Sequence, residues 1–205
     1  MKIDKVPFTS SIKLVPESTL LSSARFSKYI EIANGRDMVF KSINQDIWTD
    51  GIRTCTAGIV KNSQTKQIAG FHLYDTKKNL NKLEEFIDEI FSFIPNADSA
   101  LLIGGKELTN RPHSMPQFKA IREYFEKRIP NVSIFERHKI PNSESNIFYS
   151  AANDEFLINT IYSKHFGWNG KDVSSLEELL ENFGEIKIGN KDYLFINGEP
   201  VTIKS

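Results

Sequence analysis

The sequence predicts an α/β protein: a layered sandwich with a mixed β-sheet core flanked by helices, extended by a C-terminal helical pair and a β-meander. Three observations lead to this fold class. Between residues 46 and 152, strand-length apolar segments alternate with two segments of helical periodicity. A short apolar run at 99–103, closed by Gly104 and Gly105, is typical of a strand buried on both faces. Near the C-terminus, Asn and Gly pairs separate short apolar segments, as in β-hairpins.

The N-terminal segment, residues 1–45, is rich in Ser, Lys and Asn. A moderately apolar stretch over residues 20–32 predicts a helix, and Asn34 with Gly35 supplies a C-cap for it. We expect this segment to form an arm that packs on the core.

The core segment, 46–152, begins with two expected strands at 53–60 and 68–74, joined by a polar turn. A helix should follow, with Asn79 as its N-cap and Pro95 at its end. The apolar residues of this helix share one face: Leu80, Leu83, Phe86, Ile87, Ile90 and Phe91.

The second half of the core continues the alternation after the strand at 99–103. An amphipathic helix is expected over 118–129, and strands at 132–137 and 147–151 follow it, separated by a polar loop at 141–146. Strand, helix, strand, helix and strand in this order favour layers of helices packed on a sheet.

The C-terminal segment, 153–205, differs in pattern and is expected to form an α+β extension. A helix is predicted over 154–165, and a second one begins at Ser174 and Ser175, where glutamates three residues further on form a capping box. Three short strands should complete a meander, at 185–188, 193–196 and 201–204.

The charges of the chain argue against a nucleic-acid partner. The 205 residues carry 26 basic and 26 acidic side chains, and no block of Lys or Arg is present. The sequence also has neither the apolar run of a signal peptide nor one that could span a membrane. We therefore expect a soluble, cytoplasmic protein with no membrane partner; secretion into a host cell by a route without a cleavable signal stays open.

A single cysteine, Cys55, excludes an internal disulfide framework and a Cys-rich zinc module. No histidines or carboxylates have the spacing of metal ligands, so no metal is predicted. Gly104 and Gly105 precede a helix but lack the G-x-G-x-x-G and P-loop patterns, so no cofactor is predicted either.

Cys55 and His72 are the candidate catalytic pair. A thiol needs a nearby base to become a thiolate, and His72 lies in the expected strand that would pair with the one starting near Cys55. Adjacent strands would bring the two side chains within reach. The alternative is structural: Cys55 as a small buried hydrophobe and His72 as a hydrogen-bonded strand residue.

The spacing around this pair resembles that of the CheD-type glutamine deamidases. In that family, which shares its fold with the deamidase domains of cytotoxic necrotizing factor and Burkholderia lethal factor, a Thr lies six residues before the nucleophilic Cys and a His seventeen after it. Here Thr49 and His72 occupy those positions relative to Cys55. Gly70, shortly before His72, and the strand ending in Gly104-Gly105 are also similar.

The resemblance covers roughly residues 49–151, and two positions depart from it. Arg53-Thr54 stands where the family usually has Gly-Ser, and Tyr74-Asp75 replaces a Leu-Pro that is common after the His. The terminal segments have no counterpart in the family.

The resemblance implies a cysteine hydrolase that deamidates a glutamine side chain of a protein through a thioester. Cys55 would be the nucleophile, His72 the base, and Thr49 the residue that orients the imidazole, with Thr54 as a rival for that role by proximity. Thr54, Gly104 and Gly105 would line the substrate site. The partner would be a chemoreceptor-like protein or, for a bacterial effector or toxin, a host protein.

Two other readings remain open. A catalytically inactive member of this fold could serve as a binding module. Alternatively, a transglutaminase or amidase activity could use the same thioester, because an amine can replace water as the acceptor.

Overall fold

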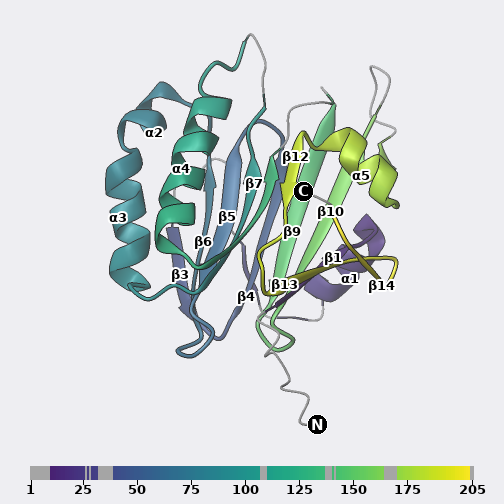
Figure 1. Cartoon of the computed structure of the whole chain (residues 1–205), viewed down its shortest axis with the longest axis horizontal. Coiled ribbons are helices and arrows are strands. Elements are labelled where there is room, and N and C mark those ends of the chain that lie inside the picture. Colours follow the sequence, from purple (N-terminus) through teal and green to yellow (C-terminus); the bar gives the residue numbers. More distant parts are fainter. Residues whose placement is uncertain are drawn as a thin grey trace.

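The computed structural model describes residues 10–25, 27, 29–31, 39–106, 110–136, 140, 142–163 and 170–203. Two mixed β-sheets pack face to face, and helices cover their outer sides (Figure 1). This arrangement confirms the predicted α/β layered sandwich.

In the first sheet, sheet A, β1 is an inner strand, paired in parallel with β10 on one side and β13 on the other. β9 and β4 continue beyond β10 in antiparallel pairs, and β2 pairs in parallel with β4. The strands, in spatial order, are β14 (Glu199–Val201), β13 (Asp192–Ile196), β1 (Ser10–Leu14), β10 (Glu155–Tyr162), β9 (Ser143–Ser150), β4 (Asp46–Ile52) and β2 (Tyr29–Glu31), with β11 (Lys171–Asp172) paired to β10.

The second sheet, sheet B, contains β5, which follows Cys55, and β6, which holds His72. All its pairs are antiparallel except that between β7 and β8. The spatial order is β12 (Glu185–Lys187), β8 (Asn131–Glu136), β7 (Ser99–Gly104), β5 (Thr56–Lys61), β6 (Gln67–Leu73) and β3 (Val39–Ile43).

The helices cover the two outer faces unequally. α2 (Lys77–Asn81), α3 (Leu83–Phe93) and α4 (Ser114–Arg128) lie on the side of sheet B, at the left of Figure 1. α1 (Glu17–Arg25) packs its buried Leu20 on Trp48 and Phe148 of sheet A. α5 (Leu176–Asn182) is followed by Phe183, whose ring contacts Phe135 at 5.4 Å between centroids and closes the core beside β12.

The main core lies between the sheets. Alternate residues of each strand point inward, as in β4, β5 and β10, and the inner residues Ile47, Ile59 and Phe156 have no exposed surface. A second core lies between sheet B and α3 and α4. Sheet B is therefore buried on both faces, which explains the continuous apolar runs of β5 and β7.

The elements predicted in the core segment are confirmed, with shifted bounds. β9 begins at Ser143, so most of the loop predicted at 141–146 belongs to a strand. The first predicted helix is divided into α2 and α3, and its N-cap is Thr76, whose hydroxyl accepts a hydrogen bond from the Asn79 N–H, rather than Asn79 itself.

The helix predicted over 154–165 is wrong, because residues Glu155–Tyr162 form β10. This strand pairs with β1 and β9, and both of its faces are buried: Phe156 and Ile158 point to the main core, whereas Leu157 packs under α1. The expected helical pair is therefore reduced to α5 in the described residues, capped by Ser175 as predicted.

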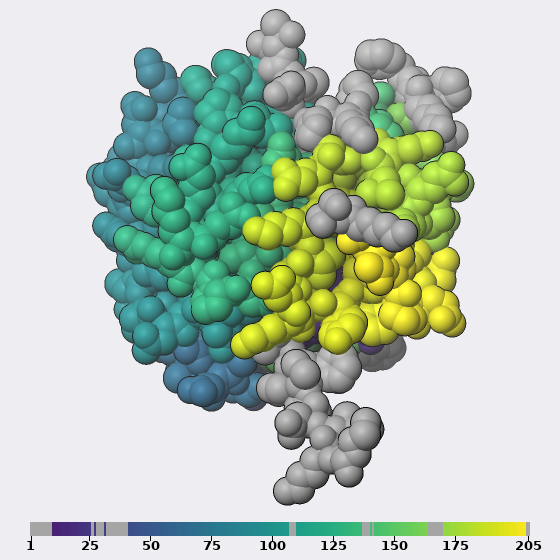
Figure 2. Space-filling model, in the orientation of Figure 1, coloured from purple at the N-terminus to yellow at the C-terminus, as the bar shows by residue number. Residues whose placement is uncertain are grey.

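Three short C-terminal strands are present, the last of them, β14, at Glu199–Val201 instead of the expected 201–204, but they do not form a meander. β12 joins sheet B beside β8, whereas β13 and β14 join sheet A. Ion pairs bind β12 to α4, from Arg122 to Glu185 and from Lys187 to Glu126. In Figure 2 the teal surface of α4 and the yellow C-terminal segment meet along this boundary.

The N-terminal segment contributes more than an arm, since β1 is an inner strand of sheet A. Its helix, α1, ends at Arg25 rather than near residue 32, and the expected cap at Asn34 and Gly35 lies outside the described residues. Within the described ranges, no helix has the length and apolar character needed to cross a membrane.

Candidate active site

Cys55 lies where the chain crosses from one sheet to the other. β4 ends at Ile52 in sheet A, and β5 begins at Thr56 in sheet B, so that residues 53–55 form the connecting bend. Gly51, just before the bend, has a φ of 67° and interrupts the pairing of β4 with β9. Its N–H donates to Asn146 Oδ1 at 3.0 Å, which fixes the irregular backbone.

His72 lies on β6, close to the same end of the sandwich. In the β5–β6 ladder His72 is directly opposite Ala57, two residues along the chain from Cys55. Ala57 and Ile68 belong to the core between the sheets, so the alternation of strand side chains also turns His72 inward. Its side chain is fully buried.

Thr49, on β4, meets His72 from the opposite sheet. The Thr49 Oγ1 lies 2.8 Å from His72 Nδ1, a hydrogen-bond distance, and both side chains are completely buried. The residue six positions before Cys55 thus contacts the residue seventeen positions after it, because the bend folds β4 over β6.

Thr54 contacts other groups. Its hydroxyl donates to Asp75 Oδ1 at 3.2 Å, and its carbonyl oxygen accepts a 2.6 Å hydrogen bond from Ser114 Oγ. The same Ser114 hydroxyl accepts the Lys106 N–H at 3.0 Å. Thr54 therefore ties the Cys55 bend to the end of β6 and to the first residue of α4, and it does not orient His72.

Gly104 and Gly105 lie beside this bend, at the end of β7. A Cβ on Gly104 would stand only 2.8 Å from the carbonyl oxygen of Cys55 and 2.9 Å from the Thr56 Cα. A Cβ on Gly105 would meet the Phe118 ring at 2.9 Å. The double glycine thus permits the backbone of β7 to touch the backbone of the candidate nucleophile, while Gly105 packs against α4.

Burial keeps both members of the candidate pair uncharged in the free protein. Burial, aided by the negative charge of Asp75, raises the pKa of the Cys55 thiol to about 12, with Arg111 acting in the opposite direction. Burial also lowers the pKa of His72 to about 4, although Asp50 opposes this. At neutral pH the pair is therefore a thiol and a neutral imidazole.

The hydrogen bond to Thr49 bears on the tautomer of that imidazole. If Nδ1 carries the ring proton and donates to Thr49 Oγ1, then Nε2 has a free lone pair and can act as a base. Nε2 is buried and has no hydrogen-bond partner among the described residues, so no hydrogen bond joins it to Cys55. Catalytic hydrogen bonds often form only when substrate is bound.

Three contributors to this site were not found from the sequence. Ser114 gave no signal beyond its place near the start of an expected helix. Asp75 and Arg111 form an ion pair at 3.6 Å next to Thr54. Asp75 could have been noticed, since it stands where the resembled family has Leu-Pro.

The described residues contain no group of three or more His, Cys, Asp and Glu side chains that could hold a metal ion. Comparisons with protein-family models and with curated proteins give no match.

Proposed function

We propose that the chain is a cysteine-dependent hydrolase that deamidates a glutamine side chain of a protein substrate through a thioester. The observation that carries this proposal is the 2.8 Å contact between Thr49 and His72, which holds a neutral imidazole opposite Ala57 of β5, the strand that follows Cys55. A nucleophile, a base and a group that orients the base are the three parts that this chemistry requires.

The reaction uses one proton relay. His72 Nε2 takes the proton from Cys55 Sγ as the sulfur attacks the carboxamide carbon, and the resulting S–C bond replaces the C–N bond. Ammonia leaves with the proton that His72 returns. Water then attacks the thioester, giving a glutamate side chain and restoring the thiol.

The developing oxyanion needs hydrogen-bond donors, and the backbone N–H groups of the bend at 53–55 are the candidates for this role. The contact of Gly104 with the Cys55 carbonyl group supports a rigid bend, because β7 leaves it no room to move in that direction. A preformed arrangement of this kind reduces the reorganisation that accompanies the reaction.

Mass spectrometry of glutamine-containing protein substrates, with parallel measurement of released ammonia, tests the proposal. Wild-type protein should convert glutamine into glutamate, a gain of about one mass unit per site, and the Cys55→Ser and His72→Ala variants should not. Deamidation retained in either folded variant would contradict the assignment. An added primary amine that becomes attached to the glutamine would indicate a transglutaminase instead.

One observation favours a second candidate, a catalytically inactive binding module. The Cys55 side chain is only 5% exposed, its pKa lies well above the ordinary thiol range, and no hydrogen bond joins it to His72 in the described structure. In that case the thiol would resist alkylation, and the reaction rate would be the same in wild type and His72→Ala.

The proposed partner is a protein with an accessible glutamine. A chemoreceptor-like protein fits a cytoplasmic enzyme, whereas a host protein fits a bacterial effector delivered into another cell. The charges near the thiol, those of Asp75 and Arg111, indicate which side chain of a substrate the site accepts.

A further inference from the structure

A buried carboxylate lies beside the candidate nucleophile. The side chain of Asp75 is 2% exposed, and its Oδ1 accepts a hydrogen bond from the hydroxyl of Thr54, the residue that precedes Cys55. Its other oxygen, Oδ2, is buried and has no hydrogen-bond partner in the described structure. Burying a carboxylate oxygen without a hydrogen-bond donor costs free energy, so most buried polar atoms have a partner. An unpaired one next to a candidate active site therefore suggests a role in binding.

Arg111 compensates the negative charge of Asp75 only in part. Its Nη1 lies 3.6 Å from Asp75 Oδ1, which is longer than a hydrogen bond, and the Arg111 side chain is 53% exposed. Both charges reach the thiol, since Asp75 raises the pKa of Cys55 and Arg111 lowers it. The ion pair thus leaves one acceptor oxygen of Asp75 unused, on a carboxylate that is hydrogen-bonded to the residue before Cys55.

We propose that Asp75 is the specificity-determining residue of this site: its free oxygen accepts an N–H of the substrate's primary carboxamide, and its charge rejects a carboxylate. The inference rests on the proposed function and narrows it to neutral amide side chains. A carboxamide offers two N–H donors, whereas a carboxylate offers only acceptors. A buried acceptor therefore separates glutamine from glutamate strongly, because the wrong group leaves it unpaired and adds a second negative charge.

The same feature acts on the product. Deamidation converts the N–H donor group into a carboxylate at the position that Asp75 faces in the complex. Two like charges at short range in a low-dielectric site repel each other. Asp75 thus favours release of the glutamate form and disfavours its return.

Two alkylating reagents reproduce this difference on a small scale. Iodoacetamide and iodoacetate attack a thiolate at the same kind of carbon, but the first carries a carboxamide and the second a carboxylate. Cys55 is the single cysteine of the chain, so the modified site is unambiguous. Both reagents react with the same thiolate, so the ratio of their rate constants does not depend on the fraction of thiol that is ionised.

The ratio is measured for folded wild-type protein and compared with that of 2-mercaptoethanol, a small neutral thiol. We expect wild type to prefer iodoacetamide by roughly tenfold more than the small thiol does, and Asp75→Asn to bring the ratio close to that of the small thiol. Arg111→Gln should raise the ratio above wild type, because it removes the opposing charge. Asp88→Asn, which makes the same charge change on the exposed face of α3, should leave it unchanged.

Three results would overturn the inference: a wild-type ratio equal to that of the small thiol, a ratio that does not differ between folded wild type and Asp75→Asn, or a thiol that reacts with neither reagent. Arg111→Gln alters an exposed side chain and tests the sign of the effect even if Asp75→Asn does not fold. The ratio of alkylation rates can be measured whether or not the protein deamidates a substrate. A ratio that follows Asp75 without any deamidated protein would retain the carboxamide subsite and reject the deamidase.

Discussion

The imidazole of His72 is held by one hydroxyl group, that of Thr49, across the space between two sheets. Thr49→Val keeps the volume of the side chain but removes this hydrogen bond, which frees the ring tautomer and orientation. We expect kcat to fall by roughly tenfold or more with little change in KM, as for the loss of one buried hydrogen bond. Thr49→Ser should restore most of the activity; a folded valine variant as active as wild type would exclude the orienting role.

His72 also makes the stability of the protein dependent on pH. Its pKa is lowered from 6.5 to about 4, so between these values the unfolded chain binds more protons than the folded one. The neutral His72 adds its full contribution to the free energy of unfolding above about pH 6.5. This contribution, at most about 3 kcal/mol, is lost as the pH falls toward 4.

Urea unfolding at pH 7 and at pH 4.5 checks this contribution. The free energy of unfolding should decrease less for His72→Gln than for wild type, whereas His113→Gln should follow wild type. Equal decreases in wild type and His72→Gln would show that the histidine is not held neutral by the fold.

At the residue scale, the spacing in the sequence indicated that Thr49 orients His72, and the two side chains are in contact; the catalytic roles of Thr49, Cys55 and His72 stay predictions. The sequence could not reveal that Thr54 turns toward Asp75 instead of His72, because that depends on how the bend at 53–55 leaves β4. Nor could it reveal that Asp75 is buried. A charged residue just after a strand is usually solvated, whereas Asp75 is buried beside Thr54 and Arg111.

The elements around the site are coupled through a backbone contact between β7 and the Cys55 bend. Gly104→Ala would push a methyl group against the Cys55 carbonyl oxygen and the Thr56 Cα, neither of which is a flexible side-chain end. We expect a loss of about 1–3 kcal/mol in the free energy of unfolding, measured with urea, and a changed alkylation rate of Cys55.

Gly198→Ala is the matched control for this substitution. Its backbone also has a positive φ, 82°, but a Cβ there would meet nothing within 4 Å. It should lower stability by only about 1 kcal/mol and leave the thiol unaffected. If Gly104→Ala left the alkylation rate unchanged, the contact would have no bearing on the nucleophile.

At the element scale, the amphipathic helices and the short apolar strand β7 were predicted, whereas β10 was not. α3, with its acidic outer side and apolar inner side, matches the expected helix. β10 does not, because sheet A needs apolar residues on both of its faces and the period of two disappears. β12 and β13 belong to different sheets. This separation depends on tertiary packing, which the turn residues between two strands do not specify.

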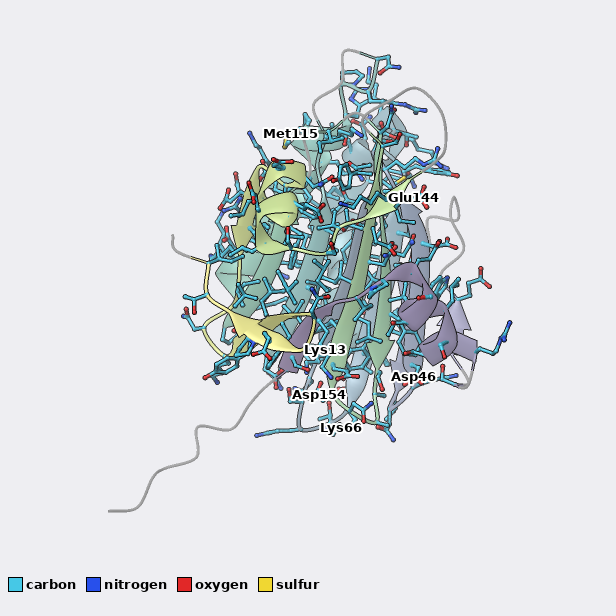
Figure 3. All side chains as sticks on the ribbon, turned by 90° about the vertical axis from the view of Figure 1, so that its right-hand side faces the viewer. Lys13, Asp46, Lys66, Met115, Glu144 and Asp154 are labelled. Carbon is cyan, nitrogen blue, oxygen red and sulfur yellow. The ribbon has the colours of Figure 1, made fainter. Side chains whose placement is uncertain are left out.

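The two ends of the sandwich differ in chemistry. Figure 3 shows Met115 and Glu144 at one end, near the bend that contains Cys55, and Asp154 at the other. There the buried ammonium of Lys61, on β5, pairs with Asp154 in the turn between β9 and β10. Tyr149 adds a 2.8 Å hydrogen bond to the same carboxylate. This cluster joins sheet A to sheet B far from the proposed active site.

Asp154→Asn should therefore destabilise the whole molecule without touching its chemistry. Removing one partner of a buried ion pair costs on the order of 3 kcal/mol, because the remaining charge stays buried. Thermal unfolding should show a lower Tm, whereas the ratio of the two alkylation rates should equal that of wild type. A shifted ratio in the folded variant would mean that the two ends are coupled.

The place of β1 has a consequence for how the protein is made. β1 is near the start of the chain, yet its partners in sheet A are β10 and β13, and Ser10 is hydrogen-bonded to Asp192, 182 positions later. A nascent chain on the ribosome must therefore keep β1 unpaired until β10 has emerged, and the second partner, β13, follows later still. Completion of sheet A is therefore a late event in folding, because it requires the slow closure of a very long loop.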